Sequence, residues 1–143
     1  MKTITSANAV YGLSIVGLFP TPQQLQGFAT DDIFDTASLA PAETMMGVDG
    51  KLSAGFVYVP VVQTISLQAD SDSNGLFEAW YAAQIAASET YRCNAVVRLV
   101  SVGRSYQLTN GVLTGYVAIA DAKKVLQPRK YQITWERVVG VPV

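Results

Sequence analysis

Hydrophobic spacing constrains this chain most, because it has the period of a helix in one segment and of β-strands almost everywhere else. Over residues 75–87 apolar side chains recur every three to four positions, and the preceding residues 70–74 supply several possible N-caps, Ser73 among them. Elsewhere short apolar runs are bounded by Gly, Pro, Asn and Asp, as is typical of strands. Many short strands with one helix favour a mainly β fold, an antiparallel β-sandwich or barrel with a flanking α-helix. We expect a single domain over residues 1–143.

Turn signals separate the predicted strands. A glycine predicts a bend or bulge in the first strand, and the two prolines of residues 20–24 predict a turn or arm, since proline cannot donate to a β-ladder. Asp49-Gly50 and Asn110-Gly111 each predict a hairpin, because such pairs accept positive φ. The strands are expected over residues 11–18, 29–36, 44–48, 52–59, 61–69, 92–100, 104–120 and 130–139.

The chain has few reactive side chains. It has no histidine, and its one cysteine, Cys93, precedes an apolar run in which a buried, unreactive thiol is expected. These features remove the usual general base, the commonest metal ligand and any internal disulfide. Asp31 and Asp32 are adjacent on a predicted strand and point to opposite faces, so they cannot act together on one substrate. We therefore expect no enzymatic activity, no metal and no cofactor.

Residues 70–75 match the first six positions of a calcium-binding loop. The twelfth position, which should be a bidentate glutamate, is Tyr81, and a tyrosine cannot chelate calcium in that way. Helix capping by these residues is therefore the favoured interpretation.

Charge is unevenly distributed along the chain. Residues 1–72 carry two bases and seven acids, whereas residues 73–143 carry eight bases and four acids. Either the halves form separate surfaces through which copies attract one another, or their strands interleave and the charges mix. One basic cluster could contact a phosphate backbone, although a solvated turn or a subunit contact is favoured. This cluster consists of Lys123, Lys124, Arg129, Lys130 and Tyr131.

The chain is rich in apolar residues, at 50%, and has 15% charged residues, against about 25% in an average domain. The apolar run over residues 10–19 is too short to span a bilayer, and no convincing secretory signal is present. We therefore expect no membrane partner, and synthesis and folding in a cytoplasm. Surplus apolar surface indicates oligomerisation, since obligate interfaces resemble a domain core cut in half.

Several individually weak motifs occur in a specific order. A turn at residues 47–51 is followed by a strand ending in residues 64–69 and by residues 70–74, which lead into the helix. An acidic segment near residues 30–34 comes before this block, and residues 131–135 (YQITW) lie in the last strand. In this order the chain resembles the tail tube proteins of contractile-tailed bacteriophages, which are related to inner-tube proteins of phage-like bacteriocins and type VI secretion.

The resemblance implies a tail-tube-like fold in which six copies close their sheets into a hexameric ring. Rings would stack head to tail, and their bore would conduct DNA and a tape-measure protein without binding DNA specifically. The resemblance also implies sheath and baseplate partners and a place in the virion tail, after assembly in the host cytoplasm. Two alternatives stay open: the inner tube of a secretion or bacteriocin device, and a monomeric β-barrel that binds a small apolar ligand.

Two sets of candidate residues follow. The flanks of Asp49-Gly50 carry more apolar bulk than a solvated loop, so residues 42–60 are expected to project and contact the next ring, unless the hairpin folds back onto its own barrel. The stacking candidates are Met45, Met46, Asp49, Gly50, Lys51, Leu52, Phe56 and Tyr58. A bore that passes DNA should not grip it, so acidic side chains are expected to face the lumen. The lumen candidates are Asp31, Asp32, Asp35 and Glu43.

Overall fold

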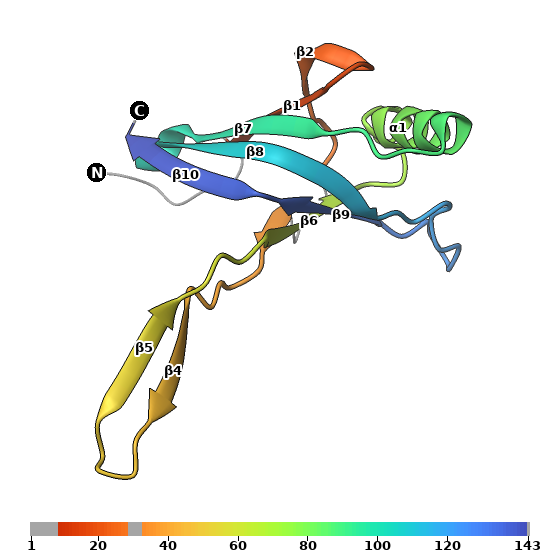
Figure 1. The fold of residues 1–143 in the computed structure, drawn as a ribbon. Coiled ribbons are helices and arrows are strands. Elements are labelled where there is room, and N and C mark those ends of the chain that lie inside the picture. Colours follow the sequence, from red (N-terminus) through yellow and green to blue (C-terminus); the bar gives the residue numbers. More distant parts are fainter. Residues whose placement is uncertain (1–8, 29–32, 143) are drawn as a thin grey trace.

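The computed structural model describes residues 9–28 and 33–142, which form a mainly β structure with one α-helix (Figure 1). The elements in chain order are β1 (Ala9–Ile15), β2 (Phe19–Gln24), β3 (Phe34–Thr36), β4 (Ala42–Met46), β5 (Leu52–Phe56), β6 (Val61–Leu67), α1 (Asn74–Ala87), β7 (Cys93–Leu99), the short 3-10 helix η2 (Val100–Val102), β8 (Arg104–Gly115), β9 (Arg129–Trp135) and β10 (Arg137–Pro142). Within these two ranges no helix combines the length and apolar character that a membrane crossing requires.

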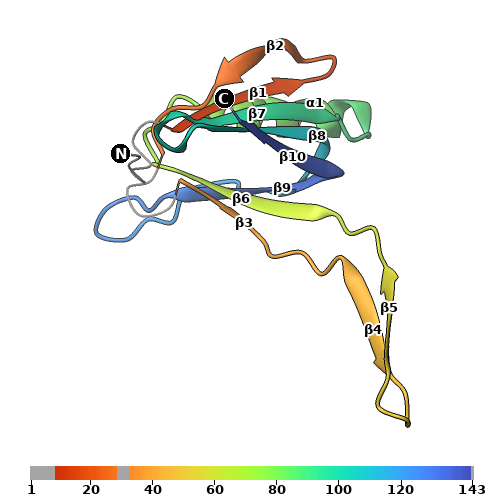
Figure 2. The same cartoon turned by 90° about the vertical axis from the view of Figure 1, so that its left-hand side faces the viewer.

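Most of the strands form one antiparallel sheet in the order β2-β1-β7-β8-β9-β6-β3, with β10 beside β8. The sheet folds over itself into two layers, with β2, β1 and β7 in one and β9, β6 and β3 in the other (Figure 2). The end strands β2 and β3 do not pair with each other, so the described strands do not close into a barrel. The predicted fold class is confirmed in its sandwich form, with α1 flanking the sheet (Figure 1).

In this sheet the second-half strands β7, β8 and β9 lie between two pairs of first-half strands. β1 pairs with β7, and β6 pairs with β9. The acid-rich first half and the base-rich second half therefore share the same layers, and their charges mix. Within the sheet, the interpretation in which strands of the two halves interleave is therefore confirmed.

Strand β8 is continuous across Asn110-Gly111, where the sequence predicts a hairpin. Asn110 has a φ of 53°, and the register of β8 against β7 shifts at this point, which is a β-bulge. Before the bulge β8 lies between β7 and β10, and after it β8 pairs with β9. The Asn110 side chain donates to Glu136 Oε2 at 2.7 Å, and its backbone N–H donates to Asn94 Oδ1 at 3.0 Å. The positive φ therefore bends a strand instead of reversing the chain.

The N-terminal strands also differ from the prediction. The first strand ends at Ile15, and the chain reverses at Gly17, where φ is 85°. Residues 20–24, predicted as a turn or arm, belong to β2, which is an edge strand of the sheet. An edge strand bonds on one side only, so it accommodates Pro20 and Pro22 without losing ladder bonds to a second neighbour.

The core lies between the two layers and against α1. Gln63 Oε1 accepts hydrogen bonds from the Tyr11 hydroxyl at 2.6 Å and from Trp135 Nε1 at 3.2 Å. Phe77 of α1 stacks on Tyr131, with 4.1 Å between ring centroids. The largest buried side chains are Trp80, Trp135, Tyr11, Tyr131 and Phe77. The alternation predicted along β6 and β9, and the core positions predicted for both tryptophans, are confirmed.

Helix α1 has Ser73, one of the predicted candidates, at its N-cap position, but no capping hydrogen bond from that side chain. Ser73 has helical φ and ψ and makes no side-chain capping hydrogen bond. Asn74 is buried instead: its amide donates to Gln68 O at 2.9 Å, and its Oδ1 accepts from the Tyr131 hydroxyl at 2.8 Å. Residues 70–75 thus anchor the helix to the sheet, and the fifth position of the calcium-loop pattern points into the core.

Cys93 is buried, and this burial raises the pKa of its thiol to about 12. The thiolate is the reactive form, so we expect a thiol-reactive dye at mildly alkaline pH to leave the folded protein unlabelled and to label it after denaturation. A Ser53→Cys chain, whose new thiol lies on an exposed strand, provides the positive control. Rapid labelling of the folded native chain would contradict the buried position of Cys93.

Candidate assembly surfaces

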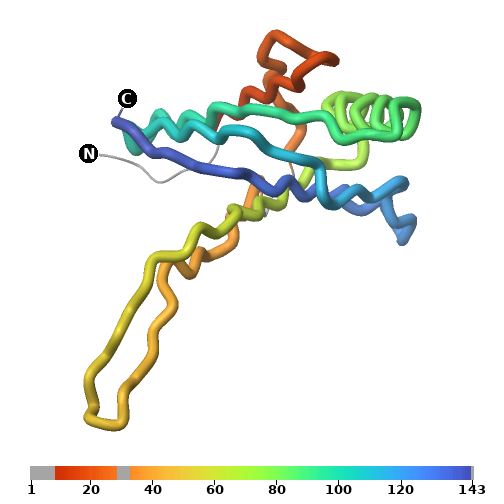
Figure 3. Tube along the Cα trace, in the orientation of Figure 1, coloured from red at the N-terminus to blue at the C-terminus, as the bar shows by residue number. Residues whose placement is uncertain are grey.

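Strands β4 and β5 form a hairpin that extends away from the layered body (Figures 1 and 3). They prolong the antiparallel ribbon of β3 and β6, because backbone hydrogen bonds connect the two parts. Ala37 N–H donates to Val62 O at 2.8 Å, and Val57 N–H donates to Pro41 O at 2.9 Å. The hairpin is therefore the outer end of one ribbon, whose other end is paired into the sheet.

The turn at the tip of the hairpin is closed by local hydrogen bonds. Gly47 N–H donates to Lys51 O at 2.8 Å, and Lys51 N–H donates to Asp49 Oδ1 at 3.2 Å. Gly50 has a φ of 82°, whereas Asp49 does not have positive φ. The predicted hairpin is confirmed, but its loop is longer than a two-residue type I′ turn, in which both central residues have positive φ.

The two faces of the hairpin differ in chemistry, because alternate residues of a strand share a face. One face carries Ala42, Thr44, Met46, Leu52, Ala54 and Phe56. The ring of Tyr58 meets that of Phe56 edge to face, with 4.9 Å between centroids, and extends this surface. These seven residues are termed the apolar hairpin face below. The opposite face carries Glu43, Met45, Ser53 and Gly55.

No residue of β4 or β5 is buried. Met46 and Leu52 are each 63% exposed, and Phe56 is 72% exposed. A two-stranded hairpin is at best marginally stable by itself, and large contiguous apolar surface is rare on monomeric proteins. The hairpin therefore has the properties of a surface that a partner covers.

The structure divides the stacking candidates between three positions. Met46, Leu52, Phe56 and Tyr58 share the apolar hairpin face, and Met45 lies on the opposite face. The remaining candidates, Asp49, Gly50 and Lys51, form the turn.

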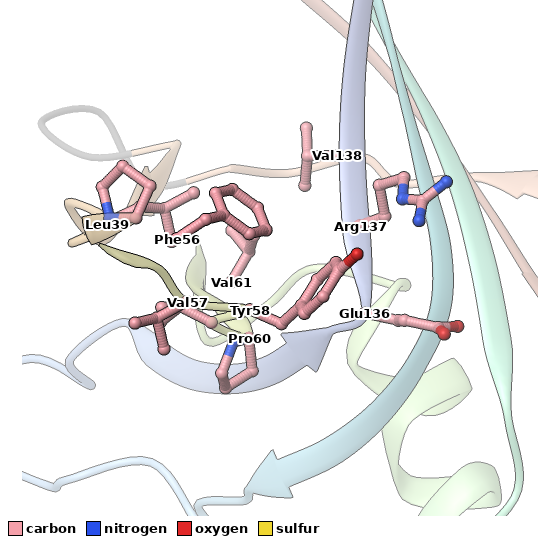
Figure 4. A pocket seen from close by; sticks show the side chains of 11 residues that line it. Leu39, Phe56, Val57, Tyr58, Pro60, Val61, Glu136, Arg137 and Val138 are labelled. Atoms are coloured by element: carbon pink, nitrogen blue, oxygen red, sulfur yellow. The ribbon is translucent and has the colours of Figure 1, made fainter. Parts of the chain in front are cut away.

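A pocket of about 690 Å³ lies where the hairpin joins the body (Figure 4). Residues 56–61 line one side of it, and residues 136–138 line another. Val138 belongs to β10, whose outer edge pairs with no other strand in the part of the chain that the structure describes. The apolar hairpin face thus continues through this pocket to an open sheet edge, which is a template for pairing with another chain.

The outer face of the layer formed by β3, β6 and β9, together with the end of β8, is polar. Asp35 pairs with Thr64, which pairs in turn with Gln132. The hydroxyls of Thr114 and Thr134 lie 2.9 Å apart. The exposed or half-buried residues of this polar sheet face are Asp35, Val62, Thr64, Val112, Thr114, Lys130, Gln132 and Thr134. Its described residues thus include one acid and one base among hydroxyl, amide and valine side chains.

The lumen candidates do not form one group. Asp35 is exposed on the polar sheet face. Glu43 is exposed on the hairpin, opposite the apolar hairpin face, and so belongs to a different surface. Asp31 and Asp32 lie outside the described residues.

The fold divides the predicted basic cluster. Arg129 is buried, and its Nη1 donates to Glu78 Oε1 at 2.7 Å while its Nη2 donates to Val117 O at 2.8 Å. Burial is the largest single influence on the pKa of Arg129 and lowers it, but the hydrogen bond to Glu78 and the interactions with Tyr131 and Tyr116 together outweigh burial, so this pKa lies above its ordinary value. Lys123 and Lys124 stay exposed in the loop after β8. Arg129 therefore has a structural role that its place in a run of bases does not indicate.

A smaller pocket, of about 330 Å³, opens between the two layers near β10. Its walls include Phe34, Leu99 and Val138. This volume is at the low end of ligand sites, which run from about 300 to 1,000 Å³. The described strands enclose no barrel interior in which a small apolar ligand could be held. Among the residues that the structure describes, no group of three or more His, Cys, Asp or Glu side chains could hold a metal ion.

Comparisons with known proteins relate the chain to tail proteins. The family model described as tail fiber protein gp32 matches residues 2–139. A chain of the sheath/tube terminator of PVC, an extracellular contractile injection system, is similar in structure, with a TM-score of 0.62 at 11% identity over 99% of this chain and 98% of that one. No curated protein sequence matches significantly.

Two assemblies of the anti-feeding prophage contain further similar chains. The baseplate chain has a TM-score of 0.59 at 10% identity, over 100% of this chain and 98% of that one. The chain from the tube-terminating cap has a TM-score of 0.56 at 13% identity, over 100% of this chain and 93% of that one. At these identities the likeness concerns the fold.

Proposed function

The chain belongs to the tail fiber protein gp32 family, and on that premise we propose that it is a structural protein of a contractile phage tail. Six copies close into a ring, and rings stack head to tail into the inner tail tube, whose bore conducts DNA during ejection. The proposal assigns the chain no reaction. Its partners are other copies of itself and the sheath, baseplate and tape-measure proteins, in a virion tail assembled in the host cytoplasm.

The exposed hairpin carries this proposal. Its apolar hairpin face projects from the body and leaves Met46, Leu52 and Phe56 in solvent. The part of the chain that the structure describes extends a two-stranded hairpin from one end of the body and a loop from the other (Figure 2), and this asymmetry supports a heterologous head-to-tail contact. Such contacts propagate without closing, as a tube requires.

Free sheet edges support lateral closure of the ring. Among the described strands, β2 and β3 each have one unpaired edge, and β10 pairs on one side only. Pairing an edge with that of a neighbouring copy satisfies its backbone groups and removes an aggregation hazard. In a closed ring every copy pairs its free edges with those of its two neighbours.

The polar sheet face is our candidate for the bore lining, with Asp35 as its acidic member. DNA held by many Lys or Arg contacts would bind in a salt-dependent manner and would not slide freely. Hydroxyl and amide side chains such as Thr64 and Gln132 solvate a passing duplex without fixed charge.

We expect assembled native protein to retain no duplex DNA in a gel-shift assay at physiological salt. The double substitution Thr64→Lys and Thr134→Lys places two cations per copy on the polar sheet face, so we expect retention that weakens steeply as salt is raised. The matched control is Gln107→Lys with Thr109→Lys, on exposed positions of β8 that the proposal keeps outside the bore. Equal retention by the control would contradict the bore assignment.

Negative-stain microscopy and native mass spectrometry of the purified chain test the proposed function itself. We expect hexameric rings at micromolar concentration and tubes of uniform width as concentration rises. A chain that stays monomeric at every concentration would overturn the proposal.

A terminal ring of the tube is a second candidate, because two of the similar structures belong to a sheath/tube terminator and a tube-terminating cap. A terminal ring uses the same lateral contacts but stacks on one side only. Single rings that do not elongate alone, yet shorten tubes when added to tube protein, would favour this candidate.

A further inference from the structure

We propose that the loop between β8 and β9, at the end of the body opposite the hairpin, receives the hairpin of the next copy of this chain. This loop, residues 116–128, is termed the distal loop. The inference rests on the proposed function, since it names the surface on which the hairpin of a stacked copy docks.

The hairpin and the distal loop lie at opposite ends of the same pair of strands. In the ladder of β6 and β9, Val61 pairs with Trp135 and Leu67 pairs with Arg129. The hairpin is attached before Val61, and the distal loop ends before Arg129, so the length of these strands separates them, about 23 Å at 3.3 Å per residue. Figures 1 and 2 show the hairpin and the distal loop extending from opposite ends of the layer formed by β9, β6 and β3. When a second copy is related to the first by translation along these strands, the hairpin of one copy meets the distal loop of the other.

The distal loop exposes apolar side chains that a solvated loop does not need. Ile119 is 79% exposed, Val125 is 70% exposed and Leu126 is 61% exposed. Val125 and Leu126 also line a pocket of about 640 Å³ together with residues 68–70 at the end of β6. Met46, Leu52 and Phe56 of the apolar hairpin face have the size and chemistry to pack against such a surface, and methionine adapts well to contact surfaces.

The fold holds the distal loop in place from both ends. Its first residue, Tyr116, stacks on Tyr81 of α1 at 4.3 Å between centroids. At its other end the guanidinium of Arg129 lies 5.4 Å from the ring centroid of Tyr131 and donates to two carbonyl oxygens of the loop. Within it, Gln127 N–H donates to Asp121 O at 2.9 Å. An exposed apolar loop that is pre-organised in this way loses little entropy on binding, which favours a docking role.

Charge complements the apolar match. The hairpin carries Glu43 and Asp49 with one base, Lys51. The distal loop carries Lys123 and Lys124 with one acid, Asp121, and Asp70 lies beside Lys124 in the pocket. The hairpin thus carries a net charge of −1 and the distal loop, counted without Asp70, a net charge of +1, so charge favours contact between the two over contact between like surfaces.

A complementation experiment tests this pairing. The hairpin variant is Met46→Asp with Leu52→Asp, and the distal-loop variant is Val125→Asp with Leu126→Asp, all at exposed positions. Each variant alone keeps one intact surface, so we expect single rings and complete loss of tubes. Mixing the two variants restores one contact per pair of rings, and we expect stacks of two rings that do not elongate. The control Val16→Asp with Val100→Asp alters two equally exposed valines outside both surfaces and should still form tubes.

The outcomes separate this inference from the proposed function. Tubes from the distal-loop variant, while the hairpin variant forms none, would overturn the distal loop as the receiving surface and leave the stacking role of the hairpin intact. Absence of rings and tubes from the native chain would overturn the proposed function and the inference with it. Two-ring stacks that form in the mixture only would support both.

Charge reversal provides an independent test in case an aspartate variant fails to fold. Lys123→Glu with Lys124→Glu should abolish tubes at low salt, and adding Glu43→Lys with Asp49→Lys in the same chain should restore them. Restoration would support direct pairing of the two surfaces. Loss of tubes in the first variant without restoration in the second would contradict it.

Discussion

A chain in which residues 44–54 are replaced by Asn-Gly is expected to fold normally, to form rings and to form no tubes. The excision ends at Glu43 and Gly55, which pair with each other, so a two-residue turn can close the shortened ladder. None of the removed residues is buried. We therefore expect only a small change in the free energy of unfolding, because no buried side chain is lost. Microscopy and a thermal melt measure the two effects.

The two faces of the hairpin provide a matched pair of milder variants. Met46→Thr with Leu52→Thr makes the apolar hairpin face polar, and we expect it to shorten or abolish tubes. Met45→Thr changes the opposite face and should leave elongation closer to normal. Normal tubes from the excised chain would show that rings stack through another part of the molecule.

Sequence patterns predicted those parts of the fold whose signal is local. Alternation of apolar and polar residues along β6 and β9 reports which side is buried, because successive side chains point to opposite faces. The hairpin at Asp49-Gly50 is likewise a local signal between two apolar runs. Helical spacing located α1 to within one residue at its start.

The wrong predictions concern local signals that fit two structures, between which the pairing of distant strands decides. A positive φ at Asn110 fits a hairpin turn and a bulge equally well, and the outcome depends on β9 and β10 sharing one edge of β8. Pro20 and Pro22 exclude a central strand but not an edge strand, and only the sheet order shows which applies.

The candidate surfaces were predictable in part. Apolar bulk beside a turn marked the hairpin, but the separation of Met45 from Met46 needed the observed register. The ion pair of Glu78 and Arg129 joins residues 51 positions apart, so no local spacing could indicate it. Asp35 and Glu43 are both acids next to or within predicted strands, so the sequence does not distinguish them, whereas the fold places them on different surfaces.

The second large effect is expected at Gly111, inside the bulge of β8. A Cβ atom on Gly111 would lie 2.5 Å from Trp135 Cε3 and 3.0 Å from Cys93 Sγ, both of which are buried and cannot move aside. We expect Gly111→Val to destabilise the fold by about 3 kcal/mol, the upper end of typical overpacking. At this chain length that lowers Tm by roughly 6 to 12 °C.

The same substitution at Gly55 separates overpacking from the general effect of removing a strand glycine. Gly55 also lies in a strand, but nothing lies within 4 Å of the position of its Cβ. Since valine favours strands, Gly55→Val should leave Tm unchanged or slightly raised. A thermal melt of both variants measures the difference. If Gly111→Val melted at the same temperature as the native chain, the close packing of Trp135 and Cys93 against Gly111 would be wrong.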